Sequence, residues 1–434
     1  MRLTAVVFPL FLLLGSVLYG DAKPSESALE RYIEEGLRNN LSLKHQYFDL
    51  EESIEALRHA RRMFFPSLSL HARYTWASGG RQMIVPEREH ETKVRFVQPL
   101  LNPATIMNLK IQSRIRDVHE LELAAYRRVL TAEMKKAYFN HLKALSLVVI
   151  YEKSREVLEE NLRVSQRLVD SGKATIDVVY RAKAEIAGLE QRITEAEKNR
   201  RISASFFNFL VGRPLQSSIE IIDLDDFPVD QDIRLEDSLA NALMRREELA
   251  LLGKNIEIQE KTIWMARSAN LPQVSAVLDY GFQGEEYNFT LDDDFWSASI
   301  VLEWDLFDSF RTPSKTRQAT IAKKRLEARL EELKKQIVLE TEEAYQDLLV
   351  ARKSIRTSQE EFSSFKKIFE IVAKKYEQGI SSQMEYMEAQ TKHTNSEIGR
   401  LIAQYDYFIK HAHFETVTAM SAAGPKKIAL KPKG

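Results

Sequence analysis

The chain reads FPSLSLHARYTW at residues 65–76 and LPQVSAVLDYGF at residues 271–282. In each stretch a proline ends a helical pattern, and apolar side chains then alternate with polar ones, which indicates a β-strand. The two stretches are 206 residues apart, and the same offset carries Leu29 onto Leu235 without a gap. Because this period is far longer than that of a solenoid repeat, we infer two related structural units within one architecture.

Each unit is predicted to begin with a helix and to continue into a β-hairpin. The helices are expected over Leu29–Met63 and Leu235–Ser268, the hairpins over residues 67–102 and 273–308, and the returning strands over Thr92–Leu100 and Phe295–Leu306. Strands of about ten residues that are apolar on one face only are typical of membrane barrels, although an ordinary half-buried sheet shows the same alternation. The long polar hairpin loops and an N-terminal secretory signal favour the membrane.

Four predicted strands are too few to close a membrane barrel, which needs about eight or more. Open sheet edges are not tolerated in lipid, so the chain is expected to associate with copies of itself. Two copies would supply about eight strands, whose side chains nearly fill the interior, whereas three would supply about twelve and enclose a lumen.

A very long helix is predicted after each hairpin. The helices from Pro103 to Gly172 and from Pro313 to Gly379 would each be about 100 Å long. Apolar residues recur at seventh positions from Leu330, which indicates a coiled-coil seam. Glycine suits the left-handed residue that closes a helix, so the chain should turn near residues 172 and 379 and return as a second helix. The expected fold is mainly α, with two long antiparallel helical hairpins and four β-strands, internally duplicated.

The two ends of the chain and the junction between the units carry further signals. An apolar stretch after Arg2 predicts a cleaved signal peptide, although an uncleaved membrane anchor would have a similar length. The acidic, proline-containing junction is interpreted as a linker, with a calcium-binding loop as the alternative. The predicted organisation is a signal peptide (1–22), a first repeat (23–212), a linker (213–231), a second repeat (232–420) and a disordered basic tail (421–434).

The composition argues against several classes of function. The chain has no cysteine, which excludes disulfides, thiolate metal sites and thiol nucleophiles. Its 62 basic and 63 acidic residues nearly balance, so no electrostatic case exists for binding nucleic acid. The histidines are scattered, and neither a zinc-protease motif nor a glycine-rich phosphate loop is present. We therefore expect no enzymatic activity, no cofactor and no metal site.

The order of these features resembles that of the TolC-type outer-membrane efflux channel family over essentially the whole mature chain. The short sequence motifs that carry the resemblance are FPSL at 65–68, QPL at 98–100, FLVGRP at 209–214, LPQV at 271–274 and WDL at 304–306. The resemblance implies a homotrimer in the outer membrane, with a twelve-stranded β-barrel continued by a periplasmic barrel of twelve helices. It also implies passive export, in efflux or type I secretion, of substrates delivered by an inner-membrane transporter and a periplasmic adaptor.

The resemblance also assigns residues at the second helical tip. The family has a Tyr shortly before the glycine and two acidic residues after it, and the matching positions are Tyr376, Glu385 and Glu388. The family usually has Asp at the two acidic positions, so Glu departs from the family pattern by a longer side chain. Because the two Glu are three residues apart and share a helix face, three chains would form a periplasmic selectivity ring, and charged rings select ions by sign. Cation preference is therefore expected, while a solvated helix face is the simpler interpretation.

The first tip departs further from the family. Asp177 stands five positions after Gly172 instead of six, and Ser381 of the second tip stands where some members have an Arg that links neighbouring helices. Asp177, Ser381 and Tyr376 are the expected gating contacts. The turns are the expected docking surface for the adaptor, with a plain exposed turn as the alternative. The docking residues are Ser171, Gly172, Lys173, Gln378, Gly379 and Ile380.

Aromatic residues near the strand ends predict a belt in contact with the interface of the outer-membrane lipid, although core aromatics would look similar. The belt comprises Tyr74, Trp76, Tyr280, Trp296 and Trp304. A protein of another class would share part of the pattern, namely a periplasmic coiled-coil scaffold with a small soluble sheet and no pore. Drug efflux, metal efflux and protein secretion share the channel pattern, because specificity resides largely in the pump.

Overall fold

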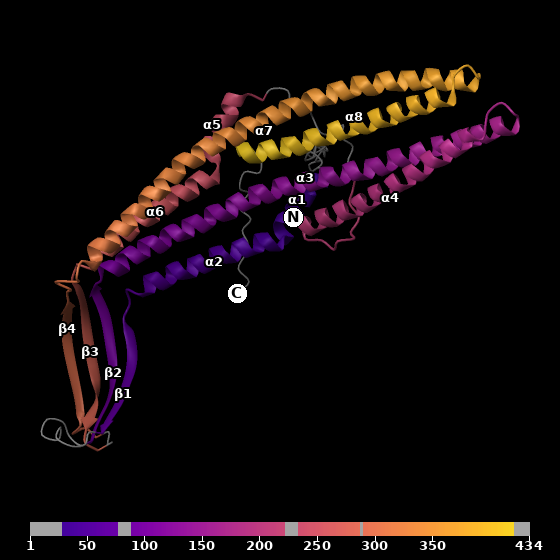
Figure 1. Ribbon diagram of the computed structural model, residues 1–434. Helices are drawn as coiled ribbons and strands as arrows, with labels where there is room; N and C mark the ends of the chain where they lie inside the picture. Colours follow the sequence, from indigo (N-terminus) through magenta and orange to yellow (C-terminus); the bar gives the residue numbers. More distant parts are fainter. Residues whose placement is uncertain (1–27, 77–87, 222–232, 287–289, 421–434) are drawn as a thin grey trace, which may run out of the picture.

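The computed structural model describes residues 28–76, 88–221, 233–286 and 290–420. Figure 1 shows a long molecule with a β-sheet at one end and paired helices that extend away from it. The first half of the chain forms α1 (Ala28–Asn39), α2 (Leu41–Arg62), β1 (Ser67–Trp76), β2 (Arg88–Leu101), α3 (Pro103–Asp170) and α4 (Asp177–Val211). The second half repeats this order with α5 (Leu235–Arg245), α6 (Glu247–Ser268), β3 (Gln273–Gly284), β4 (Asp294–Glu303), α7 (Arg311–Glu377) and α8 (Gln383–Thr418). The predicted signal peptide and basic tail, and residues 222–231 of the predicted linker, lie outside the described residues.

Each half begins with two helices instead of the single helix that the sequence predicts. Asn40 separates α1 from α2, and its Oδ1 caps α2 by accepting a hydrogen bond from the Leu43 backbone N–H at 2.9 Å. Its Nδ2 donates to the Leu210 carbonyl at the end of α4, also at 2.9 Å. The second half breaks at Arg246, the equivalent position, where the backbone is extended (φ −64°, ψ 120°). The prediction of one uninterrupted helix in each half was therefore wrong, since contacts with other parts of the chain stabilise the break.

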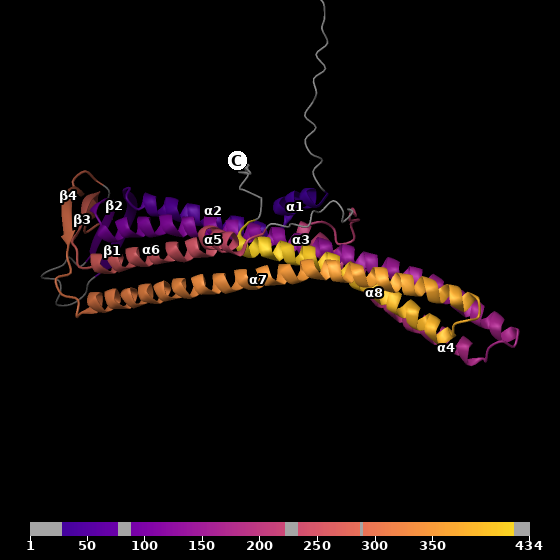
Figure 2. The same cartoon turned by 90° about the horizontal axis from the view of Figure 1, so that it is seen from above.

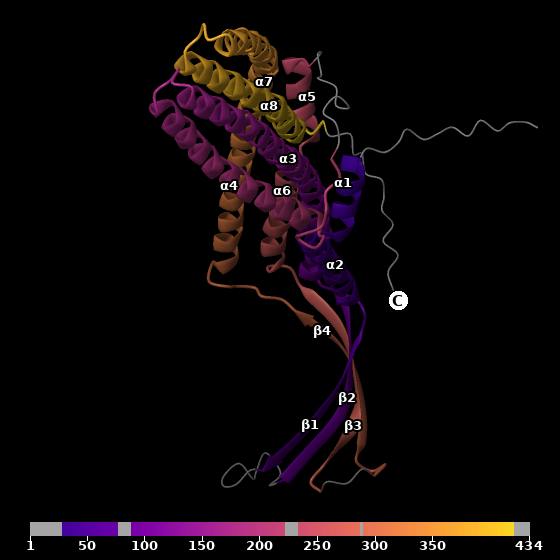
Figure 3. The ribbon, with the colours of Figure 1, turned by 90° about the vertical axis from the view of Figure 1, so that its right-hand side faces the viewer.

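The four strands form one antiparallel sheet in the order β1-β2-β3-β4. The β1–β2 and β3–β4 pairs are hairpins, whereas the β2–β3 pair joins the two halves of the chain. The sheet is strongly twisted (Figure 3), as the handedness of L-residues requires. β2 begins earlier than predicted, at Arg88, and β4 ends at Glu303, so the predicted strand end at Leu306 was wrong. Trp304 leaves the ladder because its Nε1 donates to the Asn270 carbonyl at 3.0 Å.

The hydrophobic core lies around the middle of α3, where α1, α4 and α8 pack against it. Tyr138 and Phe207 are fully buried with ring centroids 5.4 Å apart, and Tyr32 meets Phe207 edge-on at 5.2 Å. Gly36 allows α1 to approach α3 closely, because a Cβ there would lie 2.3 Å from the sulfur of Met134. Burying each of these rings contributes about 2–3 kcal/mol. α3 also packs against α2, α6 and α8, so it is the central element of the helical part.

The long helices pair as the antiparallel hairpins α3–α4 and α7–α8, and α3 packs against α8. Both tips lie at the end of the molecule opposite the sheet (Figures 1 and 2). The predicted seam on α7 is confirmed, because Ile337 and Leu348 are buried, and Phe362 and Phe369 stack on His393 of α8 at 5.6 and 5.3 Å. Among the helices of the described residues, none combines the length and apolar content that a membrane span requires.

We expect Asn40→Ala to lower the free energy of unfolding by about 1–2 kcal/mol, because it removes the cap of α2 and the donor to the Leu210 carbonyl. Thermal unfolding of the detergent-solubilised protein, followed by circular dichroism, measures the change. Asn39→Ala replaces an exposed neighbour and is the matched control, which should leave the midpoint unchanged or slightly higher. Equal midpoints for Asn40→Ala and the unmodified protein would contradict the capping role.

Candidate functional site

The two helical hairpins end in turns of the same geometry. Gly172 (φ 69°) and Gly379 (φ 73°) both adopt the left-handed conformation. At the first tip, the Gly172 N–H donates to the Val169 carbonyl at 2.9 Å and the Lys173 N–H donates to the Leu168 carbonyl at 2.8 Å, which is the Schellman arrangement. At the second tip, the Gly379 N–H donates to the Tyr376 carbonyl at 3.0 Å and the Ile380 N–H donates to the Lys375 carbonyl at 2.8 Å. The predicted docking residues are all exposed, namely Ser171, Gly172, Lys173, Gln378, Gly379 and Ile380.

α8 begins with a capping box that engages Glu385. The Ser382 hydroxyl accepts from the Glu385 N–H at 3.2 Å, and Glu385 Oε2 accepts from the Ser382 N–H at 3.0 Å. The Ser381 hydroxyl donates to the same carboxylate oxygen at 2.5 Å. These bonds, the one from the Ser381 hydroxyl above all, lower the pKa of Glu385. The carboxylate is therefore ionised at neutral pH and fixed at the start of the helix.

Glu388 lies one turn further along the exposed face of α8. Its Oε1 is 2.8 Å from Lys392 Nζ, in an ion pair within the helix. Ala389, the next residue, is buried, so the packed face of α8 lies beside the face that carries Glu388. Glu385 and Glu388 thus share an open face of the second tip, and each carboxylate has a local partner.

A glutamine side chain of the second hairpin contacts the first hairpin near its tip. Gln383, the first residue of α8, donates through Nε2 to the Ser165 hydroxyl of α3 at 2.8 Å and to the Val178 carbonyl of α4 at 3.1 Å. The Asn161 Oδ1 lies 3.4 Å from the same nitrogen, and Asn161 and Ser165 are both buried. Sequence reasoning missed this contact. Its signal was two polar residues spaced i,i+4 on the inner side of α3, where apolar residues would otherwise form the seam.

The three residues predicted to make gating contacts differ in their partners. Tyr376 stacks on Tyr386 with ring centroids 4.9 Å apart, and it hydrogen-bonds to Ser165 of the other hairpin, while burial raises its pKa. Asp177 instead bonds to Thr175 and lies 3.5 Å from Arg181, within its own segment. The Ser381 hydroxyl is engaged by Glu385 of the same hairpin. Tyr376 and Gln383 therefore carry the described contacts between the two tips.

The five predicted belt residues are exposed on the sheet or beside it, namely Tyr74, Trp76, Tyr280, Trp296 and Trp304. Tyr280 and Trp296 are direct cross-strand partners. Trp304 lies beyond the end of β4, where the chain passes toward α7. Aromatic side chains are thus found at both ends of the apolar face of the sheet.

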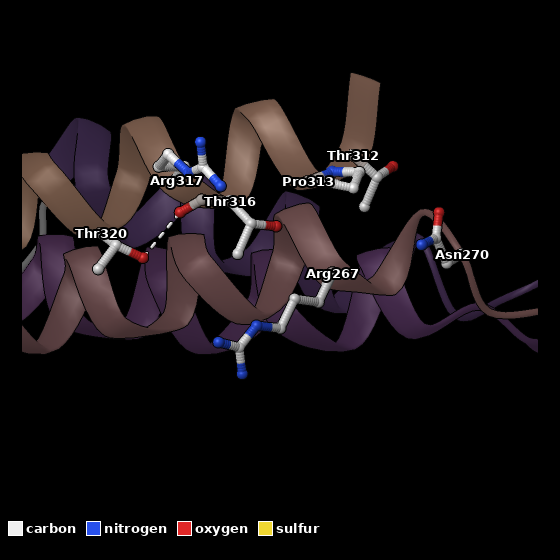
Figure 4. Close-up of a pocket in the computed structure, with 7 residues that line it drawn as sticks. All are labelled: Arg267, Asn270, Thr312, Pro313, Thr316, Arg317 and Thr320. Atoms are coloured by element: carbon white, nitrogen blue, oxygen red, sulfur yellow. Dashed lines mark hydrogen bonds between the residues drawn. The ribbon is translucent and has the colours of Figure 1, made fainter. Parts of the chain in front are cut away.

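A hollow of about 460 Å³ lies between α6 and the start of α7, with Arg267 and Arg317 among its lining residues (Figure 4). The Arg267 guanidinium lies 5.2 Å from the Trp264 ring and is turned away from Arg317 (Figure 4). The hydroxyl of Thr320 donates to the Thr316 carbonyl at 2.8 Å. The polar groups of this hollow do not converge on one point, so the tips remain the better candidate site.

Comparison with known proteins identifies the family. A family model described as "Outer membrane efflux protein" matches residues 32–213 and 239–415, one segment in each half of the chain. The chain belongs to this family. The predicted resemblance is confirmed, and the duplication seen in the sequence corresponds to two matches with one family model.

Several relatives span nearly the whole chain. Outer membrane protein TolC of Escherichia coli (strain K12) is 18% identical over 427 residues, covering 93% of this chain and 85% of TolC. TolC of Vibrio cholerae serotype O1 is 21% identical over 420 residues and covers 93% of each chain. Among solved structures, the outer membrane channel CmeC of Campylobacter jejuni has a TM-score of 0.80 at 16% identity, covering 96% of this chain and 93% of CmeC. The open state of the MtrE channel of Neisseria gonorrhoeae has a TM-score of 0.74 at 16% identity, covering 90% of this chain and 88% of MtrE.

These findings establish what kind of protein this is. It is an outer membrane efflux channel of the TolC family, a transport protein without enzymatic activity. The predicted fold class is confirmed by the long antiparallel helix pairs, the four-stranded antiparallel sheet and the two repeats. Family membership excludes the alternative of a periplasmic scaffold without a pore.

We expect Gln383→Ala to loosen the contact between the tips, because it removes the hydrogen bonds to Ser165 and Val178. Losing about 1–2 kcal/mol of local stability would speed amide hydrogen exchange of the first turn of α8 by about 5- to 30-fold. Exchange followed by mass spectrometry measures this in the assembled protein. Gln359→Ala, at an exposed glutamine of α7, is the control. If both variants exchange equally at the tip, Gln383 does not hold it.

Proposed function

We propose that three copies of this chain form a channel that crosses the outer membrane and continues as a helical tunnel into the periplasm. The open sheet carries the proposal: β1 and β4 are its two edges, and its apolar face is exposed, with Leu68 at 71% and Ile300 at 76%. Hydrocarbon cannot hydrogen-bond to an open edge, so β4 of one chain would pair with β1 of the next. Three chains of four strands each would supply twelve strands, enough for a lumen.

The helical part supports the same assembly. Large apolar side chains are exposed on the outer faces of the long helices, where neighbouring chains would cover them. They include Ile321, Leu339, Val350 and Ile371 on α7, and Ile202, Phe206 and Phe209 on α4. Exposed apolar surface of this kind is typical of interaction sites. The helices of three chains would therefore pack side by side into a periplasmic barrel.

We infer that the tips are both the entrance of the tunnel and the docking surface for a periplasmic adaptor. The exposed turns around Gly172 and Gly379 have the same backbone geometry, so one adaptor motif could engage both. An inner-membrane transporter would supply substrate and energy, and the channel would conduct passively. Opening would require the contacts of Gln383 and Tyr376 with Ser165 to separate, a movement of one helical hairpin away from the other.

The proposed selectivity ring consists of Glu385 and Glu388 from each of three chains. Purified protein in planar bilayers is expected to conduct with cation preference and to be blocked by multivalent cations. Glu385→Ala combined with Glu388→Ala should abolish the preference and the block.

The control for the ring is Glu156→Ala combined with Glu159→Ala, which removes two exposed carboxylates of the same spacing from α3. This control should conduct like the unmodified channel. If the variant that lacks Glu385 and Glu388 keeps the cation preference of the unmodified channel, the ring is refuted. If the unmodified protein does not conduct at all, the channel assembly is refuted.

Cross-linking tests the adaptor proposal. The chain has no cysteine, so Lys173→Cys or Ser381→Cys can each carry one photoactivatable cross-linker. With a co-expressed periplasmic adaptor, we expect a cross-linked product from both positions. Lys44→Cys places the same probe on α2, away from the tips, and should give none. Equal yields from all three positions would contradict docking at the tips.

A further inference from the structure

In the half of the molecule next to the sheet, the helices follow the order of the strands. α2 packs against α3, α3 against α6 and α6 against α7 (Figure 1), as β1, β2, β3 and β4 are ordered in the sheet. α2 and α7 are thus the outer helices of this layer. In the proposed trimer β4 of one chain pairs with β1 of the next, so α7, which follows β4, would lie beside the α2 that precedes β1. The inference below rests on that proposed assembly.

The internal duplication supplies a template for this contact between chains. α3 and α6 are joined to the paired strands β2 and β3 as α7 and the neighbouring α2 would be joined to β4 and β1. An offset of 206 residues relates α2 to α6, and after the strands an offset of 207, which carries Tyr138 onto Tyr345, relates α3 to α7. Leu130 and Ile337, which this second offset relates, are both buried. The packing of α3 on α6 therefore predicts the packing of α7 on the neighbouring α2.

Two ion pairs between α3 and α6 set the level of one helix against the other. Arg114 Nε lies 2.7 Å from Glu257 Oε2, and Arg128 Nε lies 2.8 Å from Glu247 Oε2. Carried over by the two offsets, residue 321 of α7 comes level with residue 51 of the neighbouring α2, and residue 335 comes level with residue 41. Because the two helices are antiparallel, the positions between these levels follow in order.

The edge of α2 that would face the neighbour is exposed and follows helical spacing. Residues three or four positions apart share a helix face, and Lys44 Nζ lies 5.6 Å from the Phe48 ring centroid, one turn along. Leu41 and Phe48 are 70% and 50% exposed. Between residues 49 and 55 every charged side chain of α2 is acidic and exposed. This edge comprises Leu41, Lys44, Phe48, Glu52 and Glu55.

The corresponding edge of α7 has the complementary charges. Ile321 and Leu339 are 62% and 66% exposed. Between residues 317 and 325 every charged side chain of α7 is basic, and the first acid beyond them is Glu327. This edge comprises Arg317, Ile321, Lys324, Arg325, Ala328, Glu332, Lys335 and Leu339.

At the levels that the template sets, unlike charges of the two edges meet. Within the described part of the chain, Glu52, Lys324 and Glu332 have no ion-pair partner of their own. Three pairs come level: Glu55 with Arg317, Glu52 with Lys324, and Lys44 with Glu332. The other basic residues come level with uncharged ones: Lys335 with Leu41, Arg325 with Phe48, and Arg62 with Ser314.

We propose that these two edges meet between neighbouring chains and that their three ion pairs select copies of this chain as partners. Exposed ion pairs add little affinity, but a chain with other charges would bring like signs together at the contact. Discrimination therefore comes mainly from what the edges reject. The backbone hydrogen bonds between β4 and β1 carry no such selection, because they use groups that every residue other than proline has.

Cross-linking tests which helices meet. The chain has no cysteine, so Glu52→Cys combined with Lys324→Cys offers one pair of thiols to a short bifunctional maleimide in isolated membranes. Cross-linked dimers and trimers are expected. In the matched control Arg329→Cys replaces Lys324→Cys, because Arg329 is also exposed but points about 140° away around the helix. Because its thiol faces away from the contact, we expect a yield about fivefold lower.

Charge reversal tests the selection. The reversed chain carries six substitutions that exchange the signs of both edges: Lys44→Glu, Glu52→Lys, Glu55→Lys, Arg317→Glu, Lys324→Glu and Glu332→Lys. It should form trimers with itself, because its two edges again complement each other. When it is co-expressed with the unmodified chain under a different affinity tag, mixed trimers should be about tenfold rarer than between two differently tagged unmodified chains.

The outcomes separate this inference from the proposed assembly. If the reversed and unmodified chains mix as freely as two unmodified chains, if the reversed chain does not assemble with itself, or if both cysteine pairs cross-link equally, the charge pairing is refuted and the trimer stands. If the unmodified chain forms no trimer in detergent or in membranes, the proposed channel assembly is refuted instead.

Discussion

A strand edge inside hydrocarbon has no water to satisfy its backbone N–H and C=O groups, and this constraint shapes the whole chain. The β2–β3 pair uses one edge of each hairpin, so β1 and β4 remain as the edges of the sheet. Each strand is joined to a helix at one end, and side-chain caps fix two of these junctions. Asn102 accepts from the Thr105 N–H at 3.0 Å at the start of α3, and Asp308 accepts from the Thr312 N–H at 2.7 Å near the start of α7. The order of the strands therefore also sets the order of the long helices.

Stability is distributed unequally along the length of the molecule. The core around Tyr138 and Phe207 buries large aromatic rings, which are costly to expose. The tips are joined by polar contacts of Gln383 and Tyr376 with Ser165, and water can replace such contacts at a net cost of only about 1 kcal/mol each. A molecule built in this way can separate its tips while the remaining helical part stays packed, which suits a channel that must open at one end.

Charge is also handled differently at the two ends. At the second tip each carboxylate has partners on its own helix or its cap, as Glu385 has with Ser381 and Ser382. On the sheet, Glu91 lies between Arg73 and Lys93, and Asp279 lies between Lys93 and Arg95. Glu385 and Glu388 thus remain exposed at the tip, while Asp279 is buried among its partners.

The sequence by itself determined the features that depend on local patterns: strands after Pro66 and Pro272, two long helices, and left-handed turns at Gly172 and Gly379. Alternation, heptads and glycine conformation act within a few residues, so each can be read from one stretch of chain. Only the tertiary structure decided the break at Asn40, the end of β4 beside Trp304, the bonds of Gln383 and the ion pair of Arg95 with Asp279. Each of these depends on a partner distant in sequence, as Asn40 depends on Leu210 and Arg95 on Asp279. Register and packing bring such partners within hydrogen-bonding distance, and no local pattern specifies them.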